Sequence, residues 1–203
     1  MKVTTSVSIL NEFCLTATPD DYDGAPPLPT FTMDHWPTPI HDDRLALASF
    51  LLFRPWISGV LAIDGTVSPA LSQMVRSVHT PVWVHLEPVE LRPKALASGS
   101  RSLTISMVGA ASAPIPVATS RTGDVSVSVL RSDQATGAIR TATGLDVASN
   151  AFMFADTPAR RDEVLAAVAC LLGQELGVGE VSLPGAATPL ARLMRAVGMA
   201  VQS

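Results

Sequence analysis

Val125-Ser126-Val127-Ser128-Val129 alternates valine with serine, and this stretch is the starting point for assigning a fold class. Successive side chains of a strand point to opposite faces of a sheet, so the three valines share one face and the two serines share the other. Strict alternation of apolar and polar residues is typical of a strand with one buried face. The stretch therefore predicts a half-buried strand at 125–130.

Two earlier segments show the same alternation, which extends the predicted sheet towards the N-terminus. Segment 103–108 alternates Leu103, Ile105 and Met107 with polar residues, and segment 82–89 alternates Val82, Val84 and Leu86 with Trp83, His85 and Glu87. Segments 139–143 and 151–154 are further strand candidates. A parallel pair needs a long crossover connection, usually a helix. No long helix is expected between these segments, so the sequence predicts an antiparallel or mixed sheet.

The first forty residues predict a strand followed by an irregular segment. Residues 3–10 place Val3, Thr5, Val7 and Ile9 on one face of an extended stretch. From 19 to 41 the chain is rich in proline, which fixes the backbone and removes a hydrogen-bond donor. This density argues against a helix or a central strand, so we expect a Pro-rich loop or arm at about 19–41.

Helices are predicted near residues 43–78 and at the C-terminus. Asp42 or Asp43 is a suitable N-cap for a helix that is apolar on nearly every side, and the stretch 45–63 is expected to hold a buried helix pair or helix-turn. Three dipeptides have the cap-then-proline pattern that begins a helix: Ser68-Pro69, Thr157-Pro158 and Thr188-Pro189. Behind the second, Val164, Val168, Leu171 and Leu172 recur at helical spacing.

These elements predict an α+β fold, and the alternative is a β-sandwich or jelly roll with helical additions. The length of 203 residues suits one domain over 1–203 that buries its own core without disulfides or metals. Cys14 and Cys170 belong to no Cys-x-x-Cys pair and are expected to be buried thiols. A cytoplasmic location is the simplest expectation for such a chain.

Charge and hydropathy restrict the class of partner. A net charge of −4 provides no clustered basic surface for a nucleic-acid backbone, so we expect no nucleic-acid binding. The longest apolar stretch, 45–63, is interrupted by Arg54-Pro55 and Gly59, so we expect no membrane span. Because 47% of the residues are apolar and only 16% are charged, part of the surface is expected to contact protein.

Asp34-His35-Trp36-Pro37-Thr38-Pro39-Ile40-His41-Asp42-Asp43 is the segment with the most candidate chemistry. Two imidazoles and three carboxylates within ten residues, Asp34, His35, His41, Asp42 and Asp43, are groups that bind a divalent metal or transfer protons. The two prolines prevent the i, i+4 helical geometry of a metalloprotease motif. The competing interpretation is that these side chains cap a helix and order a loop, with no metal or cofactor.

A second candidate is the face formed by Trp83, His85 and Glu87, whose side chains alternate with the apolar face of the same predicted strand. These three side chains could line a pocket, or they could form the solvated face of a sheet. Elsewhere the sequence contains no nucleophile elbow, phosphate loop or dinucleotide fingerprint.

The sequence does not decide whether the chain is an enzyme, and three functions follow from it. The leading hypothesis is a noncatalytic assembly or binding subunit of a homo-oligomeric or multiprotein complex, such as a shell or tail, with protein partners or self-association. The first alternative is a small-molecule enzyme that uses the His/Asp cluster at 34–43, with or without a divalent metal. The second is an inhibitor or immunity-type protein with one cognate partner.

Overall fold

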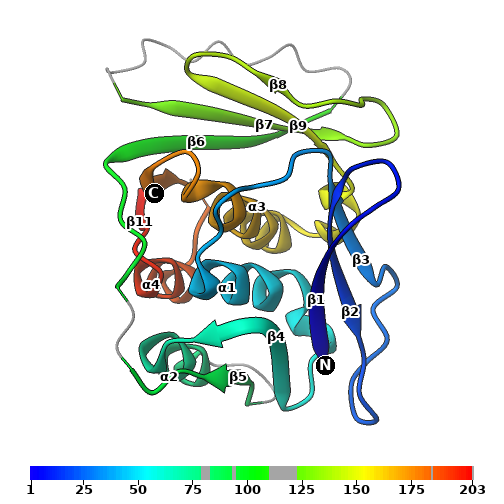
Figure 1. Cartoon of the computed structure of the whole chain (residues 1–203), viewed down its shortest axis with the longest axis vertical. Coiled ribbons are helices and arrows are strands. Elements are labelled where there is room, and N and C mark those ends of the chain that lie inside the picture. The colour runs from blue at the N-terminus through cyan, green and yellow to red at the C-terminus, as the bar shows by residue number, and fades with distance from the viewer. Residues whose placement is uncertain (79–82, 93–94, 110–122, 184, 203) are drawn as a thin grey trace.

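A computed structural model describes residues 1–78, 83–92, 95–109, 123–183 and 185–202. Within these ranges the chain forms four α-helices and one mixed sheet of eleven strands, which confirms the α+β class. Figure 1 shows that the sheet curves around two helices, α1 (Asp42–Phe53) and α3 (Pro158–Gly173), which pack against each other in the interior.

The N-terminal half, residues 1–89, forms one side of the sheet. Its strands are β1 (Lys2–Val7), β2 (Phe13–Thr18), β3 (Thr30–Met33), β4 (Val60–Val67) and β5 (His85–Val89). They lie in the order β3-β2-β1-β4-β5, in which β1 to β3 form an antiparallel meander and β4 and β5 continue it in parallel. Helix α1 precedes β4, the short 3-10 helix η1 (Arg54–Trp56) follows α1, and helix α2 (Pro69–Ser77) precedes β5.

The C-terminal half, residues 101–202, forms the other side. Its strands are β6 (Arg101–Val108), β7 (Val125–Arg131), β8 (Ile139–Arg140), β9 (Gly144–Ser149), β10 (Val178–Ser182) and β11 (Ala200–Gln202). Apart from β8, which pairs only with β9, they lie in the order β9-β7-β6-β10-β11 and are all parallel. Helix α3 precedes β10, after the 3-10 helix η2 (Ala151–Phe154), and helix α4 (Thr188–Ala196) precedes β11.

The two halves are therefore a topological repeat. Without β8, each half places its strands in the order third, second, first, fourth, fifth, and inserts its two helices before the fourth and the fifth strand. Helix α1 packs against its counterpart α3, and α2 packs against its counterpart α4. The halves differ in their second strand, which is antiparallel to the first in the N-terminal half and parallel to it in the C-terminal half.

The halves join at a seam between β3 and β9 that has one register pair, Met33 with Ser149. Side chains extend this pairing by taking the place of backbone groups. The Asn150 side chain accepts a hydrogen bond from Thr32 N at 2.8 Å and donates one to Thr30 O at 2.8 Å. Asp34 Oδ1 accepts from Ala148 N at 2.7 Å. Backbone hydrogen bonds from Asp34 N to Ala148 O at 3.0 Å and from Asn150 N to Thr32 O at 3.3 Å also cross the seam, so backbone and side chains hold it together.

The structure corrects the argument that parallel neighbours require a helix between them. Strands β7 and β9 are parallel, yet the return between them is made by a turn and the two-residue strand β8. Strands β6 and β7 are also parallel, and most of their connection, 110–122, lies outside the described residues. The sheet is mixed, as predicted, but β7 and β9 are parallel neighbours joined without a helix.

Three predicted segments have a different structure. The Pro-rich segment 19–41 contains β3, a strand inside the sheet, because Thr30 to Met33 is free of proline and alternates between buried and half-buried residues. The stretch 45–63 contains a single helix, α1, then η1 and the beginning of strand β4. Segment 151–154 forms the 3-10 helix η2 and not a strand.

The N-terminal strand ends earlier than expected. Strand β1 stops at Val7, and of the four side chains assigned to its buried face only Val3 is buried. Val7 and Ile9 are exposed, because the strand runs past the edge of the core before it turns into β2.

Helix starts follow the predicted chemistry at two of four places. Ser68 accepts a hydrogen bond from Leu71 N at 3.3 Å, and Thr157 accepts one from Arg160 N at 3.2 Å, so both cap a helix with proline in the first turn. In α4 the N-cap is Ala187, one residue earlier than predicted. In α1 the N-cap is His41, and the predicted cap residues lie inside the first turn.

The core lies between the two interior helices and the inner face of the sheet. Val164, Val168, Leu171 and Leu172 of α3 are fully buried, as the helical spacing predicts. Both cysteines are buried and free. Burial raises the pKa of the Cys170 thiol to about 12, so this thiol is protonated and unreactive at neutral pH. Within the described ranges no helix has the length and hydropathy needed to cross a membrane.

Candidate functional site

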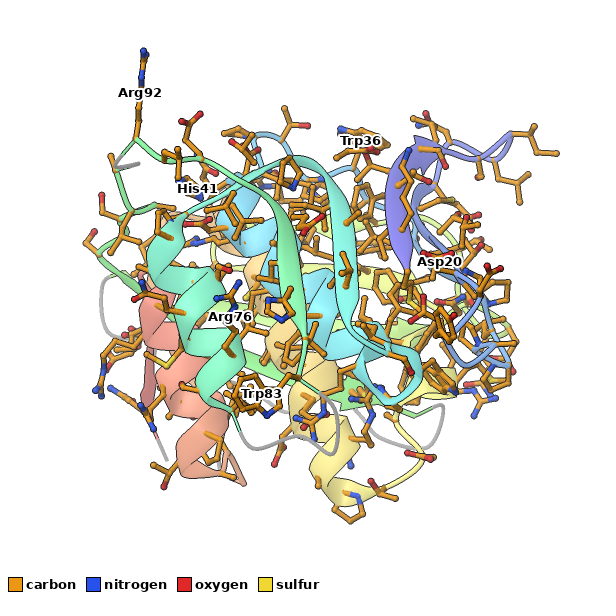
Figure 2. All side chains as sticks on the ribbon, turned by 90° about the horizontal axis from the view of Figure 1, so that it is seen from below. Asp20, Trp36, His41, Arg76, Trp83 and Arg92 are labelled. Carbon is orange, nitrogen blue, oxygen red and sulfur yellow. The ribbon has the colours of Figure 1, made fainter. Side chains whose placement is uncertain are left out.

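The fold separates the two parts of the His/Asp segment 34–43. Asp34 and His35 follow β3 at the seam, whereas His41, Asp42 and Asp43 form the start of α1. Figure 2 shows Trp36 and His41 on one side of the molecule and Trp83 on the opposite side. The predicted site residues therefore belong to three separate places.

The residues at the start of α1 attach that helix to its neighbours. His41 Nδ1 accepts a hydrogen bond from Asp43 N at 3.2 Å, and its Nε2 lies 2.9 Å from Ala95 O. An Nε2–H tautomer satisfies both contacts. Asp42 Oδ2 accepts from Thr66 N at 3.3 Å, and Asp43 Oδ1 accepts from Ser68 N at 2.7 Å. These contacts fasten α1 to the turn before α2.

His35 belongs to a polar cluster with Glu175 and Arg140. Its Nε2 lies 2.9 Å from Glu175 Oε2, and Arg140 Nη1 donates to Glu175 Oε1 at 2.6 Å. Burial raises the pKa of the Glu175 carboxyl group, but the hydrogen bond and charge of His35, with the bonds from Thr38 N and Arg140, outweigh burial and leave that pKa below its ordinary value. The cluster therefore holds an ionised carboxylate between two nitrogen groups.

Two acceptor atoms near this cluster in sequence lack partners among the described residues. They are Asp34 Oδ2 and Gln174 Oε1, both buried. Burial raises the pKa of Asp34 despite the hydrogen bond from Ala148 N. A carboxyl group with one oxygen hydrogen-bonded to the backbone is able to carry a proton on its other oxygen, which here is Asp34 Oδ2.

Of the second predicted site, His85 and Glu87 lie on the edge strand β5, Trp83 lies just before it, and Val82 of the predicted strand lies outside the described residues. Val84 and Leu86 are buried, which confirms the alternation in this segment, while Trp83 is 74% exposed and Glu87 is also exposed. His85 is half-buried. Strand β5 is the last strand of the sheet, so this face borders solvent and does not line the pocket described below.

Metal-binding residues do not converge in the part of the chain that the structure describes. No group of three or more His, Cys, Asp and Glu side chains lies close enough there to hold an ion. His35 and His41 instead have separate hydrogen-bond partners, Glu175 and the Ala95 carbonyl.

A pocket of about 250 Å³ lies where four helices end or begin, and nothing in the sequence pattern predicted it. It is bounded by the end of α1, the residue after α2, and the starts of α3 and α4, which come together in the lower part of Figure 2. Its lining residues are Leu51, Arg54, Val78, Ala159, Asp162, Glu163, Gly185, Ala187, Pro189, Leu190 and Leu193.

Charged side chains occupy one part of this pocket wall. Glu163 forms ion pairs with Arg54, at 2.9 Å, and with Arg160. Arg160 also donates to the last carbonyls of α1, to Leu51 O at 2.8 Å and to Leu52 O at 2.9 Å. Asp162, in contrast, makes no hydrogen bond or ion pair with a described residue. Burial raises its pKa, and the charge of Arg161 offsets this only in part.

No protein-family model, curated protein or solved structure matches this chain. The assignment of a function consequently depends on the geometry of the molecule itself.

Proposed function

We propose that this chain is a noncatalytic binding subunit of a homo-oligomeric or multiprotein assembly. The supporting observation is an apolar patch of Val7, Ile9 and Leu10 at the end of the β1–β2 hairpin, together with Trp36, which is exposed and packs on Phe13 of the same hairpin. Ile9 is fully exposed and Leu10 is 75% exposed. Exposed apolar side chains that gather at one place mark contact surfaces more often than those that occur singly.

The patch is continuous with the core. Val7 pairs with Phe13 across the two strands, so the two side chains share one face of the hairpin. The Phe13 ring is buried and packs edge-on against Trp36, with the ring centres 5.2 Å apart. The hairpin therefore presents its apolar tip to solvent from strands that are paired with each other and packed on the core.

The distribution of polar groups is consistent with a binding role. His41, Asp42 and Asp43 hold the start of α1, and Asp34 holds the seam. In this proposal the histidine and aspartate side chains of the segment 34–43 therefore stabilise the fold, and the exposed apolar side chains contact the partner.

Native mass spectrometry of the untagged chain from its own host tests the proposal. We expect a mass above that of the monomer, and we expect the double variant Ile9→Ser/Leu10→Ser to return to the monomer mass. Ile139→Ser is the matched control, since Ile139 is an exposed isoleucine on β8. A wild-type chain that stays monomeric and partner-free at high concentration would contradict the proposal, whereas a single co-purified protein would favour the inhibitor or immunity alternative.

A small-molecule enzyme is the second candidate, and one observation favours it. His35 is held by Glu175 but keeps 19% of its side chain exposed, as expected for a group that exchanges protons with a substrate. Metal analysis of the native protein and of its His35→Gln variant tests this interpretation, and His41→Gln, at the separate start of α1, is the control. A bound ion lost in His35→Gln alone would favour the enzyme, and unchanged function in His35→Gln would exclude it.

A further inference from the structure

The repeat relates the two ends of the α1–α3 pair, but the chain covers them differently. At the start of α1, the segment 95–97 lies over the helix ends, where Ala97 O accepts a hydrogen bond from Arg44 and Ala95 O contacts His41. A Cβ atom at Gly198, just after α4, would collide with Ala97 O. The related end, at the start of α3, holds the pocket of about 250 Å³.

The pocket walls suit a small molecule with an apolar body. Leu51 of α1, Val78 after α2, and Leu190 and Leu193 of α4 come from three different elements, and all four are buried. A cavity of about 150 Å³ accepts benzene, so this volume suits roughly ten non-hydrogen atoms. A ligand of this size would replace water on apolar walls and gain the corresponding transfer free energy.

The polar part of the wall offers one anion and one cation. The charge of Glu163 is already satisfied by Arg54 and Arg160, and the guanidinium of Arg161 is directed to Met107 O at 3.2 Å. The Asp162 carboxylate therefore keeps its hydrogen-bonding capacity among the described residues. The Arg54 side chain is 34% exposed and has one ion-pair partner, which leaves donor groups for a ligand.

We propose that this pocket binds a small apolar molecule that carries both a protonated amine and a carboxylate, as a free aliphatic α-amino acid does. Asp162 accepts hydrogen bonds from the amine, and Arg54 donates to the carboxylate. The leucine and valine side chains of the wall contact the aliphatic part. Neither group alone defines this ligand class, because an amine without a carboxylate leaves Arg54 unused and an acid without an amine leaves Asp162 unpaired.

Gly185 positions the Asp162 carboxylate. A Cβ atom at residue 185 would collide with Asp162 Oδ2, so only glycine leaves the carboxylate in its observed place. Gly185→Ala therefore moves the carboxylate without removing its charge. This variant separates the position of Asp162 from its charge.

Titration calorimetry and amide NMR with three probes test the proposal. The probes are L-leucine, isoamylamine, which lacks the carboxylate, and N-acetyl-L-leucine, which lacks the amine. We expect L-leucine to bind best and to shift the amide signals of Gly185 and Leu190. Asp162→Asn should weaken L-leucine binding about tenfold or more, the factor for one lost charge-assisted hydrogen bond. Gly185→Ala should also weaken it.

The control variant is Asp21→Asn, which removes an exposed carboxylate in the loop before β3. It should bind L-leucine as the wild type does. The proposal is overturned if the folded wild-type chain shows no saturable binding of L-leucine at about 10 mM. It is also overturned if Asp162→Asn binds L-leucine and N-acetyl-L-leucine in the wild-type ratio. Both results are independent of the hairpin patch, so they do not decide the proposed assembly function.

Discussion

Arg44 and Arg160 are each the third residue of an interior helix, and the repeat places them at opposite ends of the α1–α3 pair. Each donates hydrogen bonds to backbone carbonyls at a helix end, but only Arg160 has a carboxylate partner, Glu163. Arg44 is fully buried and bonds to the carbonyls of Val197, Ala97, Val178 and Gly198.

The difference shows that the same repeated arrangement of strands and helices can have two kinds of helix end, one closed and one open. The end with Arg44 is closed, because a buried guanidinium and the segment 95–97 fill it. Burial lowers the pKa of Arg44, and its Nη1 has no partner among the described residues. The end with Arg160 is open, because there the arginine turns to Glu163 and leaves a pocket. The Arg44 end therefore contains a buried guanidinium whose burial costs free energy, and the Arg160 end contains the pocket that could hold a ligand.

Replacing Arg44 should break the closed end and have the largest effect. Arg44→Met removes the donor but leaves four carbonyl oxygens in the core, so we expect the free energy of unfolding to fall by about 3–5 kcal/mol. Urea denaturation measures the change. Arg44→Lys keeps the charge but loses the planar guanidinium, so its free energy of unfolding should lie between those of the wild type and Arg44→Met. A loss below about 1 kcal/mol for Arg44→Met would mean that the carbonyls find other donors.

Replacing Arg160 should have a smaller effect at the open end. Arg160→Ala removes hydrogen bonds to Leu51 O and Leu52 O and one partner of Glu163, so we expect a loss of about 2 kcal/mol. Arg192→Ala, at an exposed position of α4, is the control and should stay within about 0.5 kcal/mol of the wild type. Equal losses for Arg44 and Arg160 would remove the distinction between the two ends.

Glu175 and Asp162 sharpen the comparison, because Asp162 lies near the start of α3 and Glu175 follows its end, and the pKa values of these carboxyl groups are shifted in opposite directions. For Glu175 the pKa is lowered in the folded state, so its contribution to stability is present above the pKa of the unfolded chain and is lost as the pH falls through the folded value. Glu175→Gln should therefore cost about 1 kcal/mol at pH 7. As the pH is lowered, the difference in free energy of unfolding between the wild type and Glu175→Gln should become smaller. A difference that stays constant with pH would contradict this prediction.

Asp162 should show the opposite sign and the smallest effect. Its pKa is raised in the folded state, so folding is favoured while the group is protonated, and this advantage is lost as the pH rises above the pKa of the unfolded chain. Asp162→Asn should therefore stabilise the protein at pH 7, by about 0.5–1 kcal/mol, and have less effect at acid pH. Thermal melts at several pH values measure this. Destabilisation at pH 7 would show that Asp162 has a structural partner.

The sequence predicts local elements better than the places where they meet. The alternation at 103–107 and 125–129 and the proline-marked helix starts depend on neighbouring residues, and the structure confirms them apart from the one-residue shift in α4. The pairing of His35 with Glu175 joins residues 140 positions apart, and no periodicity predicts it. The proline density of the segment 19–41 does not predict strand β3, because the four residues Thr30 to Met33 contain no proline and are enough for a strand.

The pocket and the topological repeat also lie beyond pattern analysis. Asp162 and Gly185 acquire their relation only when α3 and α4 pack, and both are unremarkable in the sequence. The helices α1 and α3 occupy equivalent positions although their first residues, Asp42-Asp43-Arg44 and Pro158-Ala159-Arg160, share only the arginine. At these two helix starts the topology of the two halves repeats, but the sequence does not.

The seam between β3 and β9 has a consequence for folding kinetics. Each half builds most of its sheet from its own strands, whereas the hydrogen bond between Thr32 and the Asn150 side chain joins residues 118 positions apart. Contacts between residues so distant in sequence form slowly, because the loop must close before they contribute. We expect each half to collapse on its own and the two to dock late, with Asp34 and Asn150 as the last groups to be ordered. A chain caught before that step would expose the edges of β3 and β9, the surfaces at which two copies could exchange halves.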